Sequence, residues 1–317
     1  MRKMDGETWE EIRKWMMQHA RPLEICLWKY FYEGGTKAEV LDVLLSYQNE
    51  DGGFGQGLEP DNWNPNSTPA TTMYAINVLR QIEFEDKEHP IFQGILKYLE
   101  SGRNRKDYGW MFGIPSNRNY PHAPWWDFRE DRDEMESRGL TADLSAFLLE
   151  NAAPDSESYH LAMEHSWRLT AYMMKETEHG EMGIGGYIRM TESIQRLQIP
   201  GFDCERMEKR IGELVTSGIE HDITAWRNYG HRPSDYIRTP QSPYYQDNRE
   251  IVEKELNYLM DTRMKHDVWP ITWTWFEHNE KFPGKFPVSE IWWKGIKTIE
   301  NTRFLQAFEE AGTDENR

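Results

Sequence analysis

Apolar residues recur at helical spacing along nearly the whole chain. In the first such segment Trp9, Ile12 and Met16 lie three or four residues apart, which places them on one face of a helix. The same period predicts about eleven or twelve helices. The segments that show it are 7–20, 21–35, 36–48, 67–82, 89–102, 139–153, 156–177, 191–199, 203–218, 248–264 and 289–312. Three other apolar runs are too short and isolated to build a sheet: 108–112, 185–190 and 268–275.

Helix start and stop signals agree with these segments. Pro22 stands at the start of the second segment, and Gly34 and Gly35 end it. Thr36 is followed three residues later by Glu39, which is the spacing of a capping box. The pattern therefore indicates an all-α protein.

The helices are joined by loops that resemble one another. Four of these loops are rich in glycine or aromatic residues and carry an acid near their start: 50–55, 106–113, 181–187 and 266–273. Helix, loop and helix at a period of some tens of residues is typical of a helical repeat array. Such an array can remain open or close into a ring, and about twelve helices is the count for six pairs. We therefore predict one α/α-toroid domain of about six helical hairpins over residues 1–317, with a long inserted loop at about 103–138.

Charge and composition narrow the range of partners. The formal net charge is -17, from 54 acidic and 37 basic residues, which argues against nucleic acid and against anionic membrane surfaces. No stretch approaches the roughly 18 apolar residues of a membrane span, and the N-terminus has no signal-type apolar run. The two cysteines are expected to be free thiols, and a cytoplasmic location is expected. Aromatic residues make up 13% of the chain, and such rings fill cores and also line deep ligand pockets.

The segment SYQNEDGGFG, residues 46–55, resembles a repeat of a known superfamily. Gln48, Asp51 and the string Gly52–Gly55 match the glutamine–aspartate–glycine–aromatic repeat of squalene-hopene cyclases and protein prenyltransferase β-subunits. The following NSTPATTMYAINVL is similar to the inner helix of that repeat, so the resemblance covers about residues 46–82. It implies a terpenoid cyclase-like α/α toroid, in a prenyltransferase-like member of bacterial type.

The acid and metal motifs of that superfamily do not recur here. The chain has neither the DxDD acid motif nor the DDxxD magnesium motif. Asp203 and Cys204 are neighbours, so on a helix they diverge by about 100° and suit one zinc ion poorly. In WDFREDRDEME the acids are separated by Arg129 and Arg132. No metal and no cofactor is therefore expected.

Two parts of the opening motif have different expected roles. The glycines 52–55 are not followed by the Gly-Lys-Ser/Thr of a phosphate-binding loop, and we interpret them as a helix cap. Glu59, Asp61 and Trp63 follow in a proline-stiffened stretch. They could favour the next helix dipole, or they could form a carboxylate pair beside a sugar-stacking ring.

The long loop supplies the next candidates. His122, Trp125, Trp126 and Asp127 lie in a proline-stiffened stretch, where they could form one wall of a pocket or pack as a lid. Asp127, with Glu59 and Asp61, is the expected catalytic acid. Trp63 joins the aromatic loop residues as an expected ligand contact.

Two later stretches are weaker candidates. His221 and Asp222 are sequence neighbours that would face different ways on a helix, and His231, Arg232 and Asp235 follow them, so structural hydrogen bonds are favoured. Further on, Trp273 and Trp275 continue an alternating run that could bind a ligand or close the ring against the first repeat.

Three functions remain open at this stage. The first is a prenyltransferase or terpene-cyclase-like protein that binds an isoprenoid or other hydrophobic ligand in an aromatic-lined axial cavity, where rings would stabilise carbocations. The second is a carbohydrate-active toroid, a hydrolase or lyase with paired carboxylates. The third is a non-catalytic binding module. All three make a small molecule the expected partner, and whether the protein is an enzyme stays open.

Overall fold

The computed structural model describes residues 3–275 and 281–314. Eleven α-helices lie in this part of the chain, and each overlaps a segment of helical spacing, so the all-α class is confirmed. They are α1 (Gly6–His19), α2 (Pro22–Tyr32), α3 (Lys37–Leu45), α4 (Pro69–Gln81), α5 (Pro90–Glu100), α6 (Asp133–Asn151), α7 (Glu157–Lys175), α8 (Gly183–Arg196), α9 (Cys204–Gly218), α10 (Arg249–Thr262) and α11 (Phe286–Asp314). Among the described residues the only strands are β1 (Arg105–Lys106) and β2 (Gly109–Trp110), which pair antiparallel.

The chain forms two compact units. Unit 1 comprises Met1–Val43, Gly212–Phe276 and Gly284–Arg317. Unit 2 comprises Leu44–Ile211 and Glu277–Pro283. The boundaries fall within α3 and α9, and the expected single domain over 1–317 stays a prediction.

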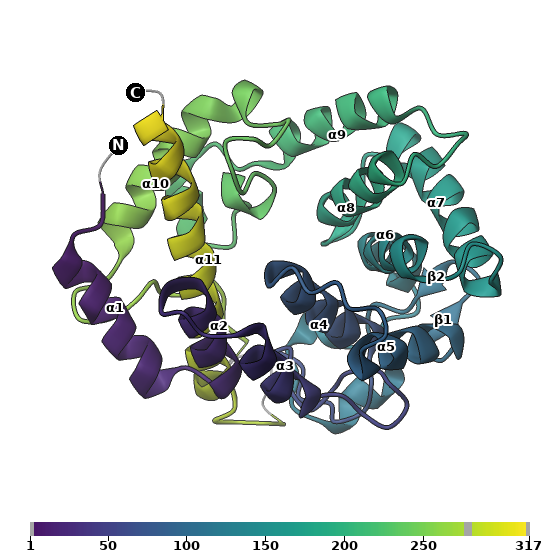
Figure 1. Cartoon of the computed structure of the whole chain (residues 1–317), viewed down its shortest axis with the longest axis horizontal. Helices are drawn as coiled ribbons and strands as arrows, with labels where there is room; N and C mark the ends of the chain where they lie inside the picture. The colour runs from purple at the N-terminus through teal and green to yellow at the C-terminus, as the bar shows by residue number, and fades with distance from the viewer. Residues whose placement is uncertain (1–2, 276–280, 315–317) are drawn as a thin grey trace. The chain divides into compact units, whose positions relative to one another are not determined.

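The core of unit 2 is built around α6. Every residue from Gly139 to Leu149 is buried, because α6 packs against α4, α7, α8 and β2. Figure 1 shows α6 and α8 side by side in teal. This contact needs glycine, since a Cβ on Gly186 would lie 2.1 Å from the carbonyl oxygen of Gly139. The two helices therefore meet backbone to backbone.

The bounds of α6 and α8 correct two expectations from the sequence. The segment 181–187 was expected to be a repeat loop, but α8 begins at Gly183, where the glycines serve the helix contact. The inserted loop at about 103–138 is shorter than expected, because α6 begins at Asp133. The Asp133 carboxylate is buried and accepts hydrogen bonds from the Phe112 amide (3.1 Å) and the Tyr108 hydroxyl (2.5 Å).

Unit 1 joins the two ends of the chain. Its N-terminal helices α1 and α2 pack on the C-terminal helix α11, seen in purple and yellow in Figure 1. The Tyr32 hydroxyl of α2 donates to Thr302 Oγ1 of α11 at 2.8 Å. Trp28 packs its ring on Tyr32, with the ring centroids 4.6 Å apart. This part-buried hydrogen bond links segments that are 270 residues apart in sequence, and the ring contact with Trp28 orders Tyr32 within α2.

Candidate functional site

The glycine-rich motif forms a tight corner after α3. Gly52 has a φ of 91°, and a Cβ there would lie 2.0 Å from the carbonyl oxygen of Gly94 on α5. The Gln48 side chain donates to the carbonyl oxygens of Gly52 (2.9 Å) and Ile91 (3.1 Å). Phe54 is fully buried. The glycines therefore serve a contact between the corner and α5, and their interpretation as a helix cap stays a prediction.

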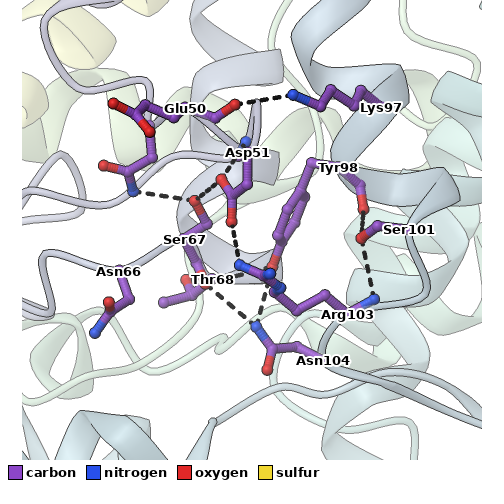
Figure 2. Close-up of polar contacts among 12 residues, drawn as sticks. Glu50, Asp51, Asn66, Ser67, Thr68, Lys97, Tyr98, Ser101, Arg103 and Asn104 are labelled. Carbon is purple, nitrogen blue, oxygen red and sulfur yellow. Dashed lines mark hydrogen bonds and ion pairs between the residues drawn. The ribbon is translucent and has the colours of Figure 1, made fainter.

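Asp51 is the polar centre of this corner, as Figure 2 shows. Its Oδ1 accepts hydrogen bonds from the Gly53 amide (3.1 Å) and the Ser67 hydroxyl (2.6 Å). Its Oδ2 receives Nη1 of Arg103 at 2.8 Å. Asn104 donates to the Ser67 carbonyl oxygen at 3.2 Å. The carboxylate thus joins three chain segments, and these contacts occupy the groups that a ligand would need.

The segment that follows the corner lies against the long loop. The Trp63 amide donates to the Pro121 carbonyl oxygen at 2.9 Å, and the Ala123 amide donates to the Asp61 carbonyl oxygen at 2.8 Å. Asn62 and His122 form the β-bridge between them. The structure therefore brings together two segments that the sequence singled out separately.

A buried asparagine network supports this contact. Asn64 Nδ2 donates to Ser116 Oγ and to Asn117 Oδ1, each at 2.8 Å. Asn117 Nδ2 in turn donates to the Trp126 carbonyl oxygen at 2.8 Å. Both asparagines are 1% exposed. The amides fix the path of the loop that carries Trp125, Trp126 and Asp127.

The three expected acids have different surroundings. Glu59 and Asp61 are buried, at 5% and 1% exposure. Asp127 lies at the surface, where its Oδ1 receives Nε of Arg118 at 2.8 Å. Asp127 is therefore already balanced by a cation, and the catalytic role expected of it stays a prediction, as do those of Glu59 and Asp61.

The expected aromatic contacts also separate into groups. Trp126 is buried and stacks on Phe112, with ring centroids 4.7 Å apart. Trp63 is half-buried and donates its indole N–H to the Pro60 carbonyl oxygen at 2.7 Å. His122 Nδ1 lies 2.7 Å from the Tyr120 carbonyl oxygen. Trp125 is half-buried in the same loop.

The last two expected ligand contacts belong to unit 1. Trp275 is fully buried and packs edge-on against Phe286, with centroids 5.7 Å apart, so it forms core. Trp273 is half-buried and has Trp293 at 5.1 Å. It lines a cleft of about 380 Å³. Trp273 is thus a residue that the sequence predicted to bind a ligand and that lines a cleft in the structure.

This cleft carries more cations than acids on its wall. Its charged and aromatic lining residues are Arg227, Arg232, Lys297, Asp261, Tyr258, Trp269 and Trp273. They come from five places: the 3₁₀ turn Ile223–Arg227, the turn at 232, helix α10, helix α11, and the extended stretch that carries the two tryptophans. Three cations and one acid around an indole favour a negatively charged ligand with a flat or apolar face.

The cations differ in how far they are already neutralised. Lys297 pairs with Glu300 at 2.8 Å, and Arg232 Nε lies 3.5 Å from Glu255 Oε1. Arg227 is exposed and has no ion-pair partner within residues 3–275 and 281–314. Arg227 is therefore the cation most available to an incoming anion.

Two acids close to Arg232, Glu255 and Asp235, have pKa values that are shifted in opposite directions from their usual values. Burial raises the pKa of Glu255 to about 7, although Arg232 and the hydrogen bonds from Ser234 oppose the shift. Burial also acts on Asp235, but the hydrogen bond from His231 and the charges of Lys297 and Arg232 outweigh it and hold its pKa well below the usual range. Such divergence is typical of acid–base sites, but it also occurs in structural ion-pair networks.

Glu255 has a visible structural role. Its Oε2 accepts from the Ser234 amide at 2.8 Å and its Oε1 from the Ser234 hydroxyl at 2.6 Å. The side chain is fully buried on α10 and fixes the 3₁₀ turn Pro233–Asp235. Glu255 therefore positions Arg232, the residue directly before that turn, at the cleft wall.

Sequence reasoning reached part of this cleft only. Trp273 was expected to bind a ligand, and Arg232 and Asp235 were noted with a structural role. Arg227, Asp261 and Lys297 were missed, because they come from a 3₁₀ turn and two different helices and share no motif in the sequence. A usable signal was the spacing of Tyr258, Asp261 and Thr262, which places them on one face of α10.

Within residues 3–275 and 281–314, no group of three or more His, Cys, Asp or Glu side chains is placed to hold a metal ion. The helices described there include none with the length and apolar character needed to cross a membrane. Comparison with known proteins gives no match: no family model, no curated protein and no solved structure matches the chain.

Proposed function

We propose that unit 1 binds a small anionic ligand with a ring face, of the acidic-sugar class, in the cleft beside Trp273. The observation that supports this is the local excess of wall cations in a chain whose net charge is -17. A carboxylate would meet Arg227, and a sugar ring would lie against the indole of Trp273. The proposal develops the carbohydrate alternative of the sequence, as binding rather than as a demonstrated reaction.

The fold resemblance stays part of the proposal. The corner formed by Gln48, Asp51 and Gly52 has the compact, helix-bridging geometry that a repeat signature would need. That geometry supports a terpenoid cyclase-like α/α toroid as the architecture. An isoprenoid ligand, a cytoplasmic location and the absence of nucleic acid as a partner stay predictions.

Calorimetric titration of the full chain tests the ligand. We expect galacturonate or a short oligogalacturonide to bind, and the matching neutral galactose ligand to bind at least about tenfold more weakly, because a charge-assisted hydrogen bond contributes roughly 1.5–3 kcal/mol. Farnesyl diphosphate is titrated in parallel as the isoprenoid ligand. Binding of that compound with none of the acidic sugars would contradict the proposal and favour the isoprenoid prediction.

The variants locate the binding. Arg227→Gln should weaken acidic-sugar binding about tenfold or more, and Trp273→Ala should also weaken it. Arg249→Gln is the matched control, since Arg249 is an exposed arginine of the same unit that pairs with Glu253 outside the cleft. Equal affinity in Arg227→Gln and Arg249→Gln would place the ligand elsewhere.

A further inference from the structure

Unit 2 contains a second cleft, separate from the residues discussed above. Its volume is about 580 Å³, and it lies among α4, α5, α6 and α8. The segment 83–87, between α4 and α5, forms part of its lining. Its wall combines phenyl rings with charged side chains, so its chemistry depends on which charges are already paired.

Four of the eight charged residues that line this cleft pair with one another, and the other four are Arg80, Glu83, Glu85 and Lys87. Glu150 accepts a hydrogen bond from Ser193 and pairs with Arg196, whose Nη2 lies 2.5 Å from Oε1. Arg189 Nη1 lies 3.3 Å from Glu192 Oε2. These acids and bases therefore offset each other across the cleft wall.

Arg80 differs from the other cations of the cleft. Its Nη1 pairs with Asp143 and donates to Asn77 Oδ1 at 3.2 Å. Its Nη2 is buried and has no hydrogen-bond partner among the residues that the structure describes. A buried donor without an acceptor costs about 1–3 kcal/mol, so an acceptor supplied by a ligand would be stabilised there.

One wall of the same cleft is apolar. Phe92 stacks on Phe147 with centroids 5.7 Å apart and ring planes 17° apart, and Phe84 lies 5.7 Å from Phe92. Phe92 and Phe147 are buried, whereas Phe84 is half-buried and Leu197 is 42% exposed. The outer end of this wall can therefore gain burial by contact with an apolar group.

We propose that this cleft binds an organic carboxylate with an apolar body, with the carboxylate at Arg80 Nη2 and the body against Phe84 and Leu197. The site is independent of the acidic-sugar cleft, because all its residues belong to unit 2. A pocket with an apolar wall and few oriented polar groups is the usual form of a small-molecule site.

Three ligands with one body and different charges test the proposal by calorimetry on the full chain. We expect 3-phenylpropionate to bind about tenfold more tightly than 3-phenylpropanol, and 3-phenylpropylamine to bind no better than the alcohol. Equal binding of all three, or tightest binding of the amine, would overturn the carboxylate assignment. Binding of 3-phenylpropionate should leave acidic-sugar affinity unchanged, so each proposal can fail without the other.

Single substitutions test which side chains of this cleft bind the ligand. Arg80→Lys keeps a cation for Asp143 but removes the guanidinium donor, and it should weaken 3-phenylpropionate about tenfold. Arg206→Lys, the same exchange at an exposed position of unit 2, should leave affinity unchanged. Phe84→Ala tests the apolar wall at a half-buried position, with an expected severalfold loss of affinity for 3-phenylpropionate. Unchanged affinity in both Arg80→Lys and Phe84→Ala would overturn the site.

Discussion

The glycine corner of unit 2 and the cleft of unit 1 differ in how their polar groups are used. In the corner, Asp51 accepts from an amide, a hydroxyl and a guanidinium, so three chain segments share one carboxylate. In the cleft, Arg227 has no ion-pair partner among the described residues, and Trp273 is half-buried. The part of the sequence that is easiest to notice is thus the part whose groups are fully engaged by the fold.

The difference has a physical origin. A corner that brings backbones within van der Waals contact needs glycine and a few fixed hydrogen bonds, and these produce a conspicuous short motif. A binding cleft needs donors and surfaces left available, and these come from separate elements. A conspicuous sequence motif is therefore a better indicator of what the fold requires than of where a ligand binds.

The largest expected effect concerns Gly52. Gly52→Ala should destabilise the protein by about 4 kcal/mol, because the added Cβ meets the Gly94 carbonyl and alanine disfavours a positive φ. Denaturant unfolding measures the change. Gly185→Ala is the control, since a Cβ there meets nothing within 4 Å. If Gly52→Ala folded normally but lost binding of the acidic sugar or of 3-phenylpropionate, the corner would have a functional role rather than a structural one.

A somewhat smaller effect is expected from Glu255 beneath the cleft. Because the pKa of Glu255 is raised to about 7 in the folded protein, its carboxyl group stays protonated to a higher pH in the folded state than in the unfolded state. Its contribution to stability should therefore fall as pH rises from about 4.5 to 7, by on the order of 3 kcal/mol. The lowered pKa of Asp235 acts below its ordinary value of 3.8, outside this window.

Unfolding measured across that pH range checks the sign. Glu255→Gln should remove the decline, and Glu253→Gln, on the exposed face of the same helix, should keep it. A decline that is unchanged in Glu255→Gln would show that Glu255 is not the group responsible, and the description of the residues behind Arg232 would need revision.

The smallest effect is expected at the rim of the corner. Arg103→Met should cost less than about 1 kcal/mol, because its ion pair with Asp51 has an arginine side chain that is 63% exposed. The shift of the urea midpoint should shrink further in high salt. A loss as large as that of Gly52→Ala would mean that the ion pair, rather than the backbone contact, holds the corner.

Helix positions followed from the sequence, because apolar spacing is local information. The start of α8 did not, since its glycines resemble a loop until Gly139 is known to lie against Gly186. The contact between the segments of Asp61 and His122 could be guessed only as a shared pocket, because hydrogen bonds between distant backbones leave no trace in composition. Arg227 and Lys297 were missed for the same reason: spatial neighbours from separate elements carry no common motif.

The packing of α1 and α2 on α11 has a consequence for the protein as it is synthesised. Unit 2 consists mainly of one continuous stretch, Leu44–Ile211, whereas unit 1 needs segments from both ends of the chain. The ribosome therefore releases nearly all of unit 2 while the first two helices still lack their C-terminal partner. During that interval the apolar faces of α1 and α2 stay uncovered, and transiently exposed apolar surface of this kind is prone to aggregation.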